Sequence, residues 1–220
     1  MKLAFISDIH SNFEALKTVL DFISKENAKQ IYCTGDTIGY NYQPNECLDA
    51  LREAKVVSVK GNHEDMALGL LDMGNYTHRA RNAIYSQKKI LKKDNISFIK
   101  KLPTELVLDD YSMRLTHGSP YKPEEFHYVL SERDVVEAFK AFKEKVCLMG
   151  HTHMPTAYRY DKKNKCFEEL SGDEIRIEAG YRYLINVGSV GESRDDNPNA
   201  CVYIYDTEEK VFKRTRLDKN

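Results

Sequence analysis

The sequence predicts an α/β fold in which two packed sheets lie between outer helices, within one domain that spans residues 1–220. Three observations lead to this prediction. The N-terminal half alternates strand-like and helix-like segments, the order expected of a layered α/β protein. The C-terminal third contains short segments that alternate apolar and polar residues, as half-exposed antiparallel strands do. No linker, repeat or low-complexity segment divides the 220 residues.

The first elements follow from apolar spacing. The run 2–7 predicts a strand, and apolar residues then recur three and four apart over 13–23, which predicts an amphipathic helix. Ser11 followed by Glu14 matches a capping box, so we expect this helix to begin near residue 12. The apolar run in 30–36 predicts a second strand that ends in Gly-Asp.

The next segments continue the alternation. We expect a helix over 46–54, a third strand that ends in a loop over 56–64, and helical structure from 65 to about 101 with a break near Gly74-Asn75. This completes a β-α-β-α-β-α order.

The remaining elements are shorter. We expect a hairpin from 105 to 120, a helix over 131–142 with Ser131 as its N-cap, and a strand followed by a loop over 145–153. Six further strand candidates are TAYRYD, KCFEEL, EIRIEA, YLINVGS, ACVYIYD and VFKRTRL. Together they supply the strands of two sheets.

Composition narrows the range of functions. The formal net charge is −1, which argues against a nucleic-acid backbone or an anionic membrane as the main partner. The five cysteines are odd in number and none are spaced as C-x-x-C, which favours free thiols in a reducing cytoplasm over disulfides or a zinc knuckle. No apolar run approaches the length of a membrane span, and no signal peptide is expected.

Residues able to bind metal follow the ends of several predicted strands. They are Asp8 and His10, Asp36, Asn62 and His63, His117, and His151 and His153. In open α/β sheets, ligands bind outside the carboxyl ends of the strands, so we expect these side chains to meet. His151 and His153 are two apart after Gly150, and in an extended segment such residues point to the same side. A surface loop with two histidines is the alternative for this stretch alone, but the clustering favours a metal site.

The residue types predict two metal ions. A mixed oxygen and nitrogen set suits manganese, iron, zinc or nickel. Seven ligands exceed what one ion takes from a protein, but they suffice for two ions if one carboxylate bridges. Such a pair lies roughly 3.5–4 Å apart, clamps a phosphoryl group, and lowers the pKa of a bridging water so that hydroxide becomes the nucleophile.

The motifs D-I-H, G-D, G-N-H-E, H-G and G-H-T-H occur in an order that resembles the calcineurin-like metallophosphoesterases. SDIHSNFEAL, GDTIGYNYQPNEC and NVGSVGESRDDNP are similar to small prokaryotic phosphodiesterases related to diadenosine tetraphosphatase. The resemblance extends to about residue 206. It implies a β-sandwich flanked by helices, in four layers, and hydrolysis of a small phosphorylated, nucleotide-like substrate such as a phosphodiester or a dinucleoside polyphosphate.

The resemblance also implies a role for each matching residue. The first ion would be held by Asp8, His10, Asp36 and His153. The second would be held by Asp36, Asn62, His117 and His151, with Asp36 as the bridge. His63 would contact the phosphate and protonate the leaving oxygen, as a general acid. If Asn62 and His63 lie in an extended segment, they point to opposite sides, which would turn His63 away from the metal.

Two alternatives and four weaker candidates remain. A phosphoprotein phosphatase is disfavoured because the residues after Gly35-Asp36 are TIGY, where those enzymes continue to Asp-Arg-Gly. A non-catalytic binding scaffold is disfavoured because every motif residue is present. Asn12, at a helix start, is a candidate phosphate contact or an ordinary cap. Arg194 is a candidate phosphate ligand, or a loop residue paired with a neighbouring aspartate. Tyr40 and Tyr42 are candidates for stacking on a nucleobase, or surface residues.

Overall fold

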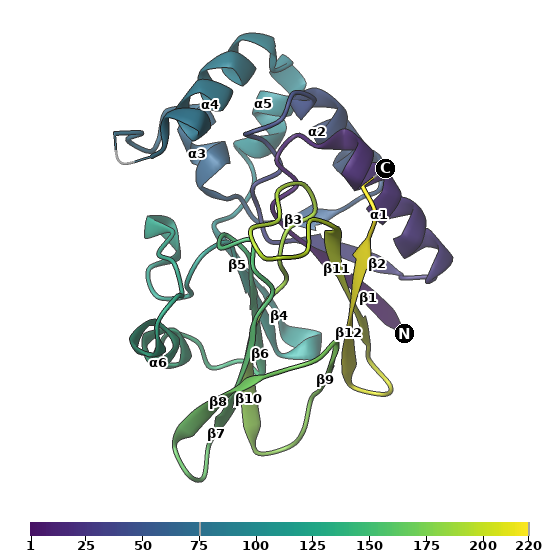
Figure 1. Ribbon diagram of the computed structural model, residues 1–220, viewed down its shortest axis with the longest axis vertical. Helices are drawn as coiled ribbons and strands as arrows, with labels where there is room; N and C mark the ends of the chain where they lie inside the picture. Colours follow the sequence, from purple (N-terminus) through teal and green to yellow (C-terminus); the bar gives the residue numbers. More distant parts are fainter. Residues whose placement is uncertain (75, 220) are drawn as a thin grey trace.

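Two six-stranded sheets pack face to face in this protein, and helices cover their outer faces (Figure 1). The computed structural model describes residues 1–74 and 76–219. The first sheet has the order β3 (Val57–Ser58), β2 (Gln30–Cys33), β1 (Lys2–Ile6), β11 (Ala200–Asp206), β12 (Val211–Leu217) and β9 (Glu174–Arg176). The second has the order β4 (Glu105–Leu108), β5 (Met113–Thr116), β6 (Val146–Met149), β10 (Tyr181–Asn186), β7 (Ala157–Asp161) and β8 (Cys166–Leu170).

The first sheet is parallel at the start of its strand order, whereas the second is parallel in its centre and begins with the antiparallel pair of β4 and β5. β1, β2 and β3 run parallel, as do β5, β6 and β10. β11, β12 and β9 continue the first sheet antiparallel, and β7 and β8 continue the second. The carboxyl ends of the parallel strands therefore define one edge in each sheet.

Strand β1 is buried on both faces, as the parallel strand of a layered fold must be. Its residues alternate: Leu3 and Phe5 belong to the apolar core between the sheets, while Ala4 and Ile6 pack toward the outer helices. This uninterrupted burial explains why the segment appears in the sequence as a continuous apolar run.

The helices form the outer layers. α1 (Phe13–Lys25) and α2 (Pro44–Glu53) cover the first sheet, and α6 (Glu132–Ala141) covers the second. α3 (Asn62–Leu68), α4 (His78–Ile90) and α5 (Lys93–Ile99) form an apolar cluster of their own above the sheets (Figure 1). The predicted fold, two sheets between layers of helices, is confirmed. Within the described residues, no helix has the length and apolar character needed to cross a membrane.

Three local predictions need correction or fall outside the structure. The N-cap of α1 is Asn12, whose Oδ1 accepts from the Ala15 N–H at 3.2 Å; Ser11 has a left-handed backbone, with φ 56°, and cannot cap. The expected third strand over 56–64 is only two residues long, because Gly61 caps α3 and Asn62 already lies in that helix. The expected break near Gly74-Asn75 falls between α3 and α4, but Asn75 lies outside the described residues.

Candidate metal centre

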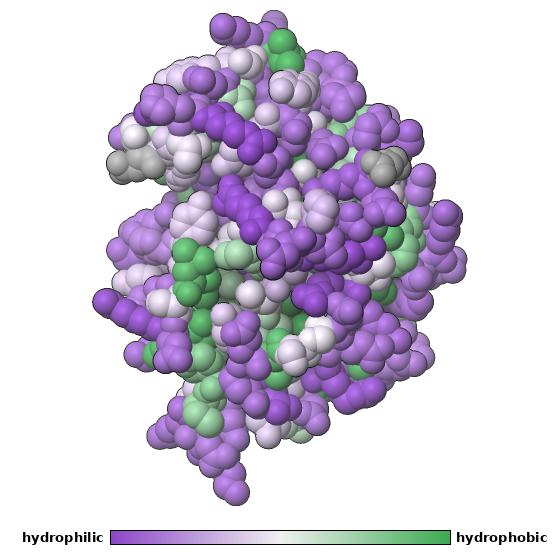
Figure 2. Space-filling view, viewed as in Figure 1, coloured by the Kyte–Doolittle hydropathy of each residue, from purple (hydrophilic) through white to green (hydrophobic). Residues whose placement is uncertain are grey.

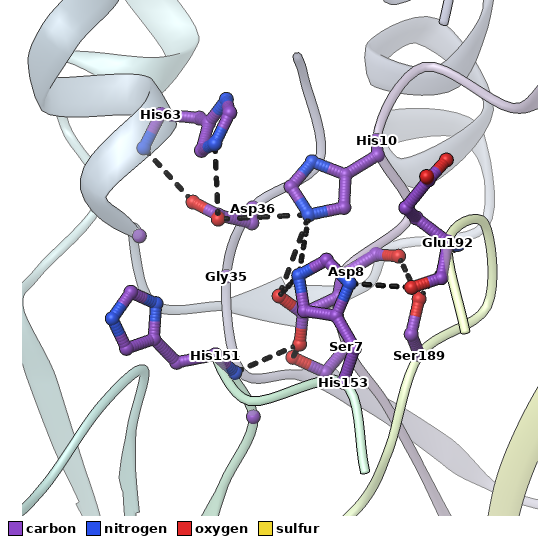
Figure 3. A network of polar contacts seen from close by, with 12 residues as sticks. Ser7, Asp8, His10, Gly35, Asp36, His63, His151, His153, Ser189 and Glu192 are labelled. Atoms are coloured by element: carbon purple, nitrogen blue, oxygen red, sulfur yellow. Dashed lines mark hydrogen bonds and ion pairs between the residues drawn. The ribbon is translucent and has the colours of Figure 1, made fainter. Parts of the chain in front are cut away.

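The loops that follow β1, β2, β5 and β6 and the start of α3 bring the candidate ligands together, and all seven are buried. Their donor atoms form overlapping groups, each compact enough for one ion: Asp8, His10 and His153; His10, Asp36 and His63; and Asp36, His117 and His151. Figure 3 shows Asp36 between the rings of His63 and His10, with Asp8 and His153 beside His10.

The first group joins the loops after β1 and β6. Nε2 of His153 lies 3.2 Å from Oδ1 of Asp8, and Nε2 of His10 lies 3.6 Å from the same oxygen. The two Nε2 atoms are 3.0 Å apart. Three donor atoms from distant parts of the sequence thus surround one point.

The second group joins the loops after β2, β5 and β6 to the start of α3. Nε2 of His117 lies 3.2 Å from Oδ2 of Asp36, 3.1 Å from Oδ1 of Asn62 and 3.1 Å from Nδ1 of His151. Oδ2 of Asp36 is also 3.7 Å from Nε2 of His10 in the first group. A single carboxylate oxygen therefore lies between the two sets of donors.

Hydrogen bonds to the backbone fix which nitrogen of each imidazole faces the centre. Nδ1–H of His10 donates to the Ile38 carbonyl at 3.0 Å, and Nδ1–H of His117 donates to the Thr34 carbonyl at 2.8 Å. Nδ1–H of His153 donates to the Glu192 carbonyl. Since carbonyls only accept, Nδ1 carries a proton in each ring, and in the neutral form of the ring Nε2 offers a lone pair, as in metal-bound histidines. The Nε2 atoms of His10 and His153 are 3.0 Å apart, and their lone pairs would repel each other unless a proton or a cation lies between them.

Asp8 also turns a lone pair toward the centre, on one of its carboxylate oxygens. Its Oδ2 accepts from the Ser7 hydroxyl at 2.6 Å and from the His151 N–H at 3.0 Å. Its Oδ1 is buried and finds no hydrogen-bond donor among the residues that the structure describes. A buried oxygen without a donor is costly, and it points at the two imidazoles of the first group. The residues present therefore fit divalent cations.

The electrostatics of the centre favour ionised carboxyls. Burial opposes ionisation of Asp8 and Asp36, but the surrounding imidazoles outweigh burial and hold the pKa of both carboxyls well below the usual range. Burial also opposes charge on His117, yet Asp36 raises the pKa of that imidazole to about 9. Burial and the charge of His117 hold the pKa of His151 well below its usual value. The carboxylates thus supply the negative charge that compensates a cation.

The backbone is strained where the ligands lie. Five of them have left-handed backbones, and such residues cost of order 1–3 kcal/mol each. They are Asp8 (φ 50°), His10 (φ 50°), Asp36 (φ 53°), His151 (φ 69°) and His153 (φ 63°). The extended geometry expected for the His-Thr-His stretch is therefore wrong, since β6 ends at Met149. The turn instead sends His151 and His153 to different groups.

Two glycines allow the loops that hold the carboxylates to lie close to neighbouring backbone. A Cβ at Gly150 would lie 2.0 Å from Oγ of Ser7, and a Cβ at Gly61 would lie 2.1 Å from Oδ1 of Asp36. Any larger residue would push apart the loops that hold the carboxylates.

His63 lies beside the cluster, on the first turn of α3. Its Nε2 is 3.9 Å from Oδ2 of Asp36, while its buried Nδ1 has no hydrogen-bond partner within residues 1–74 and 76–219. Burial lowers the pKa of His63 to about 3. The extended segment expected for Asn62 and His63 is wrong, because both are helical. The helix directs Asn62 toward His117 and directs His63 toward Asp36 and Tyr40.

Glu64 is a buried residue whose role the sequence did not reveal. Its carboxylate accepts the N–H groups of Asp36 (3.0 Å), Thr37 (2.9 Å), Ile38 (3.2 Å) and Gly61 (2.8 Å). Burial, followed by the charge of Asp36, raises the pKa of Glu64 to about 7, and the N–H donors favour the ionised form. The residue ties the Asp36 loop to α3. A Gly-x-x-Glu spacing at a helix start is the signal that could have identified it.

The weaker candidates have different surroundings. Asn12 caps α1 through Oδ1 and donates from Nδ2 to the Gly191 carbonyl at 3.2 Å, so both of its polar groups have partners. Its contact with phosphate stays a prediction. Arg194 is exposed and donates to the Tyr40 hydroxyl at 3.0 Å. Its neighbour Asp195 pairs with Arg216 instead.

Comparisons with known proteins agree with this geometry. The model of the calcineurin-like phosphoesterase superfamily domain matches residues 1–210. The uncharacterized protein MJ0912 of Methanocaldococcus jannaschii is 34% identical over 215 residues, which cover 96% of this chain and 84% of that protein.

Solved structures are similar over the whole chain. A metallophosphoesterase from Sphaerobacter thermophilus has a TM-score of 0.84 at 31% identity, over 99% of this chain and 88% of that chain. The hypothetical protein PH1004 from Pyrococcus horikoshii OT3 has a TM-score of 0.77 at 16% identity, over 100% of this chain and 88% of that chain. At that identity, the second likeness shows the fold alone.

Proposed function

The chain belongs to the calcineurin-like phosphoesterase superfamily, and from this premise we propose that it hydrolyses small phosphodiesters or dinucleoside polyphosphates with two divalent metal ions. The observation that carries the proposal is the position of Asp36 Oδ2, between Nε2 of His10 and Nε2 of His117. In its neutral form each imidazole offers its Nε2 lone pair on the side of this oxygen, so one carboxylate oxygen is placed to serve two cations.

The proposed ligands divide as the two groups of donors do. Asp8, His10, Asp36 and His153 would hold one ion. Asp36, Asn62, His117 and His151 would hold the other. Bound there, a pair such as manganese would neutralise phosphate oxygens and lower the pKa of a water.

His63 is the proposed general acid. Hydrolysis breaks the bond from phosphorus to the leaving oxygen, and that oxygen must take up a proton. Nε2 of His63 faces the cluster, and in the described part of the chain no group forms a hydrogen bond with Nδ1. A phosphate bound beside the imidazole would favour its protonated form. His63 would then hold the proton at Nε2 and pass it to the leaving oxygen, which is typically worth about 10²–10⁴-fold in rate.

The space beside the centre suits a nucleotide-like substrate. A cavity of about 770 Å³ opens next to His151 and is lined by Tyr40, Tyr76 and Tyr128 among others. Aromatic rings provide stacking surfaces for a nucleobase. We propose that the enzyme acts in the cytoplasm on such small substrates and not on phosphoproteins.

A screen of esters with purified protein tests the proposal. Metal-free protein is reconstituted with manganese, iron, zinc or nickel and assayed with chromogenic mono- and diesters, dinucleoside polyphosphates and a phosphopeptide. We expect metal-dependent hydrolysis of a diester or dinucleotide to exceed that of the phosphopeptide. Faster turnover of the phosphopeptide than of every nucleotide would contradict the substrate class, and no turnover with any metal would contradict the hydrolase.

A further inference from the structure

The cavity beside the metal centre contains two arginines to which the proposed mechanism gives no role. It is bordered by α4 on one side and by the segment around residues 125–128 on the other, and its lining includes His151, Arg79 and Arg194. Figure 2 shows the surface hollowed between the upper helices and the segment below them. A substrate held at the metal ligands would extend into this space.

Tyr40 connects the metal centre to the arginines. Its ring centroid is 4.6 Å from that of His10 and 4.9 Å from that of His63. On the cavity side, the guanidinium carbon of Arg79 lies 4.8 Å from the same centroid, and that of Arg194 lies 5.8 Å away. Two cations therefore lie against a ring whose other neighbours are His10 of the proposed metal centre and His63.

The two positive charges are only partly compensated. Arg79 donates to a carboxylate oxygen of Glu192 at 2.5 Å. Among residues 1–74 and 76–219, Arg194 pairs with no carboxylate, and its neighbour Asp195 is paired with Arg216. Two cations near one ring repel each other, so an anion between them would be stabilised.

Two acidic residues also line the cavity. They are Asp72 and Glu125, and Glu125 pairs with Lys122 at 2.7 Å and with His127 at 2.8 Å. The ring of Tyr128, another lining residue, stacks on His151 with centroids 3.9 Å apart. A substrate would therefore direct negative charge toward Tyr40 and an uncharged ring toward Tyr128.

On the basis of the proposed function, we infer that Arg79 and Arg194 bind a second phosphate of the substrate, next to the one that is hydrolysed. Guanidinium groups bind phosphate oxygens in a bidentate manner. The enzyme then prefers compounds with a phosphoric anhydride or another neighbouring phosphate, such as dinucleoside polyphosphates, over diesters with a single phosphate.

The test compares two substrates in variants of the metal-loaded protein. The substrates are diadenosine tetraphosphate and bis(p-nitrophenyl) phosphate, which has one phosphorus. We expect Arg79→Gln and Arg194→Gln each to lower the ratio of kcat/KM for the first substrate to kcat/KM for the second by about tenfold, as expected for a lost charged hydrogen bond. Arg81→Gln is the matched control. It lies on the same helix and contacts His78 outside the cavity, so the ratio should not change.

Binding of inorganic tripolyphosphate, measured by calorimetry with excess metal, tests the arginines without turnover. Arg79→Gln and Arg194→Gln should weaken it about tenfold, whereas Glu192→Gln should strengthen it, because Arg79 loses a competing carboxylate. A gain of affinity is not explained by misfolding. Equal losses for both substrates, or unchanged tripolyphosphate binding, would overturn the inference. Absence of hydrolysis in the wild type would instead overturn the proposed function, while the calorimetric result would still decide about the arginines.

Discussion

Replacing Glu64 by Gln should destabilise the fold and loosen the Asp36 loop. The carboxylate accepts four backbone N–H groups, two at each oxygen: Thr37 and Ile38 at Oε1, and Asp36 and Gly61 at Oε2. A glutamine keeps one acceptor oxygen, so two N–H groups would face an amide that also donates. Leaving two buried N–H groups without an acceptor costs about 1–3 kcal/mol each, but removing a buried charge offsets part of this loss, because burial raises the pKa of Glu64. We therefore expect a net decrease of about 1–3 kcal/mol in the free energy of unfolding.

Urea denaturation of the metal-free protein at pH 8 measures this decrease. Glu64, with a pKa of about 7, is mostly ionised at pH 8. Removing metal avoids the additional stability that a bound ligand confers. Glu14→Gln is the control, because the Glu14 side chain is 63% exposed and its carboxylate pairs with Lys17 on the same helix at 3.5 Å; its effect should stay within about 0.5 kcal/mol. A loss below about 1 kcal/mol in Glu64→Gln would refute the assignment of Glu64 as the support of the Asp36 loop.

Three further predictions concern the ligands, the general acid and the pH dependence of stability. Asp36→Asn should lose most of both ions by elemental analysis, and two ions per chain in this variant would contradict the bridge. His63→Ala should keep both ions but lower turnover by about 10²–10⁴-fold, with a smaller loss for esters with good leaving groups such as nitrophenolate. His151→Ala should instead weaken metal binding itself. Loss of metal from His63→Ala but not from His151→Ala would contradict these roles. Burial acts to raise the pKa of Glu144, but hydrogen bonds from Arg114 outweigh it and hold that pKa below its ordinary value of 4.5. A lowered pKa stabilises the fold above the unfolded value, so Glu144→Gln should cost about 1–3 kcal/mol at pH 7, and the difference should shrink as the pH falls below 4.5; a difference independent of pH would exclude the ion pair as its source.

The sequence determined the elements and the order of the motifs. Continuous apolar runs predicted β1 and β6, and helical spacing predicted α1 and α6, because burial of one face imposes a period that is visible along the chain. Ser131 was predicted as the N-cap of α6 and is confirmed, since its hydroxyl accepts from the Asp134 N–H at 3.3 Å. The position of the ligands after strand ends followed from the layered architecture alone.

Local geometry at the loops did not follow from the sequence. Ser11 and Asn12 are both capping residues by type, and the choice between them depends on the left-handed turn that bonds the Ser11 N–H to the Thr37 carbonyl at 2.8 Å. His151 and His153 were expected to share one direction, but left-handed backbones separate them. Such strain persists only where the surrounding structure imposes it, so sequence patterns do not reveal it.

The tertiary structure alone brought Glu64 beneath the Asp36 loop and placed Arg79 against Tyr40. Arg79 lies on a helix whose pattern in the sequence is that of an ordinary exposed face, and nothing near it in the sequence indicates a phosphate. It lies against Tyr40, beside the metal centre, because α4 packs on the loop after β2, where Gln87 accepts from the Gly39 N–H and donates to the Asn41 carbonyl. Periodicity reports which face of an element is buried, whereas a cavity depends on how distant elements are packed together, and that packing is decided only when the whole chain has folded.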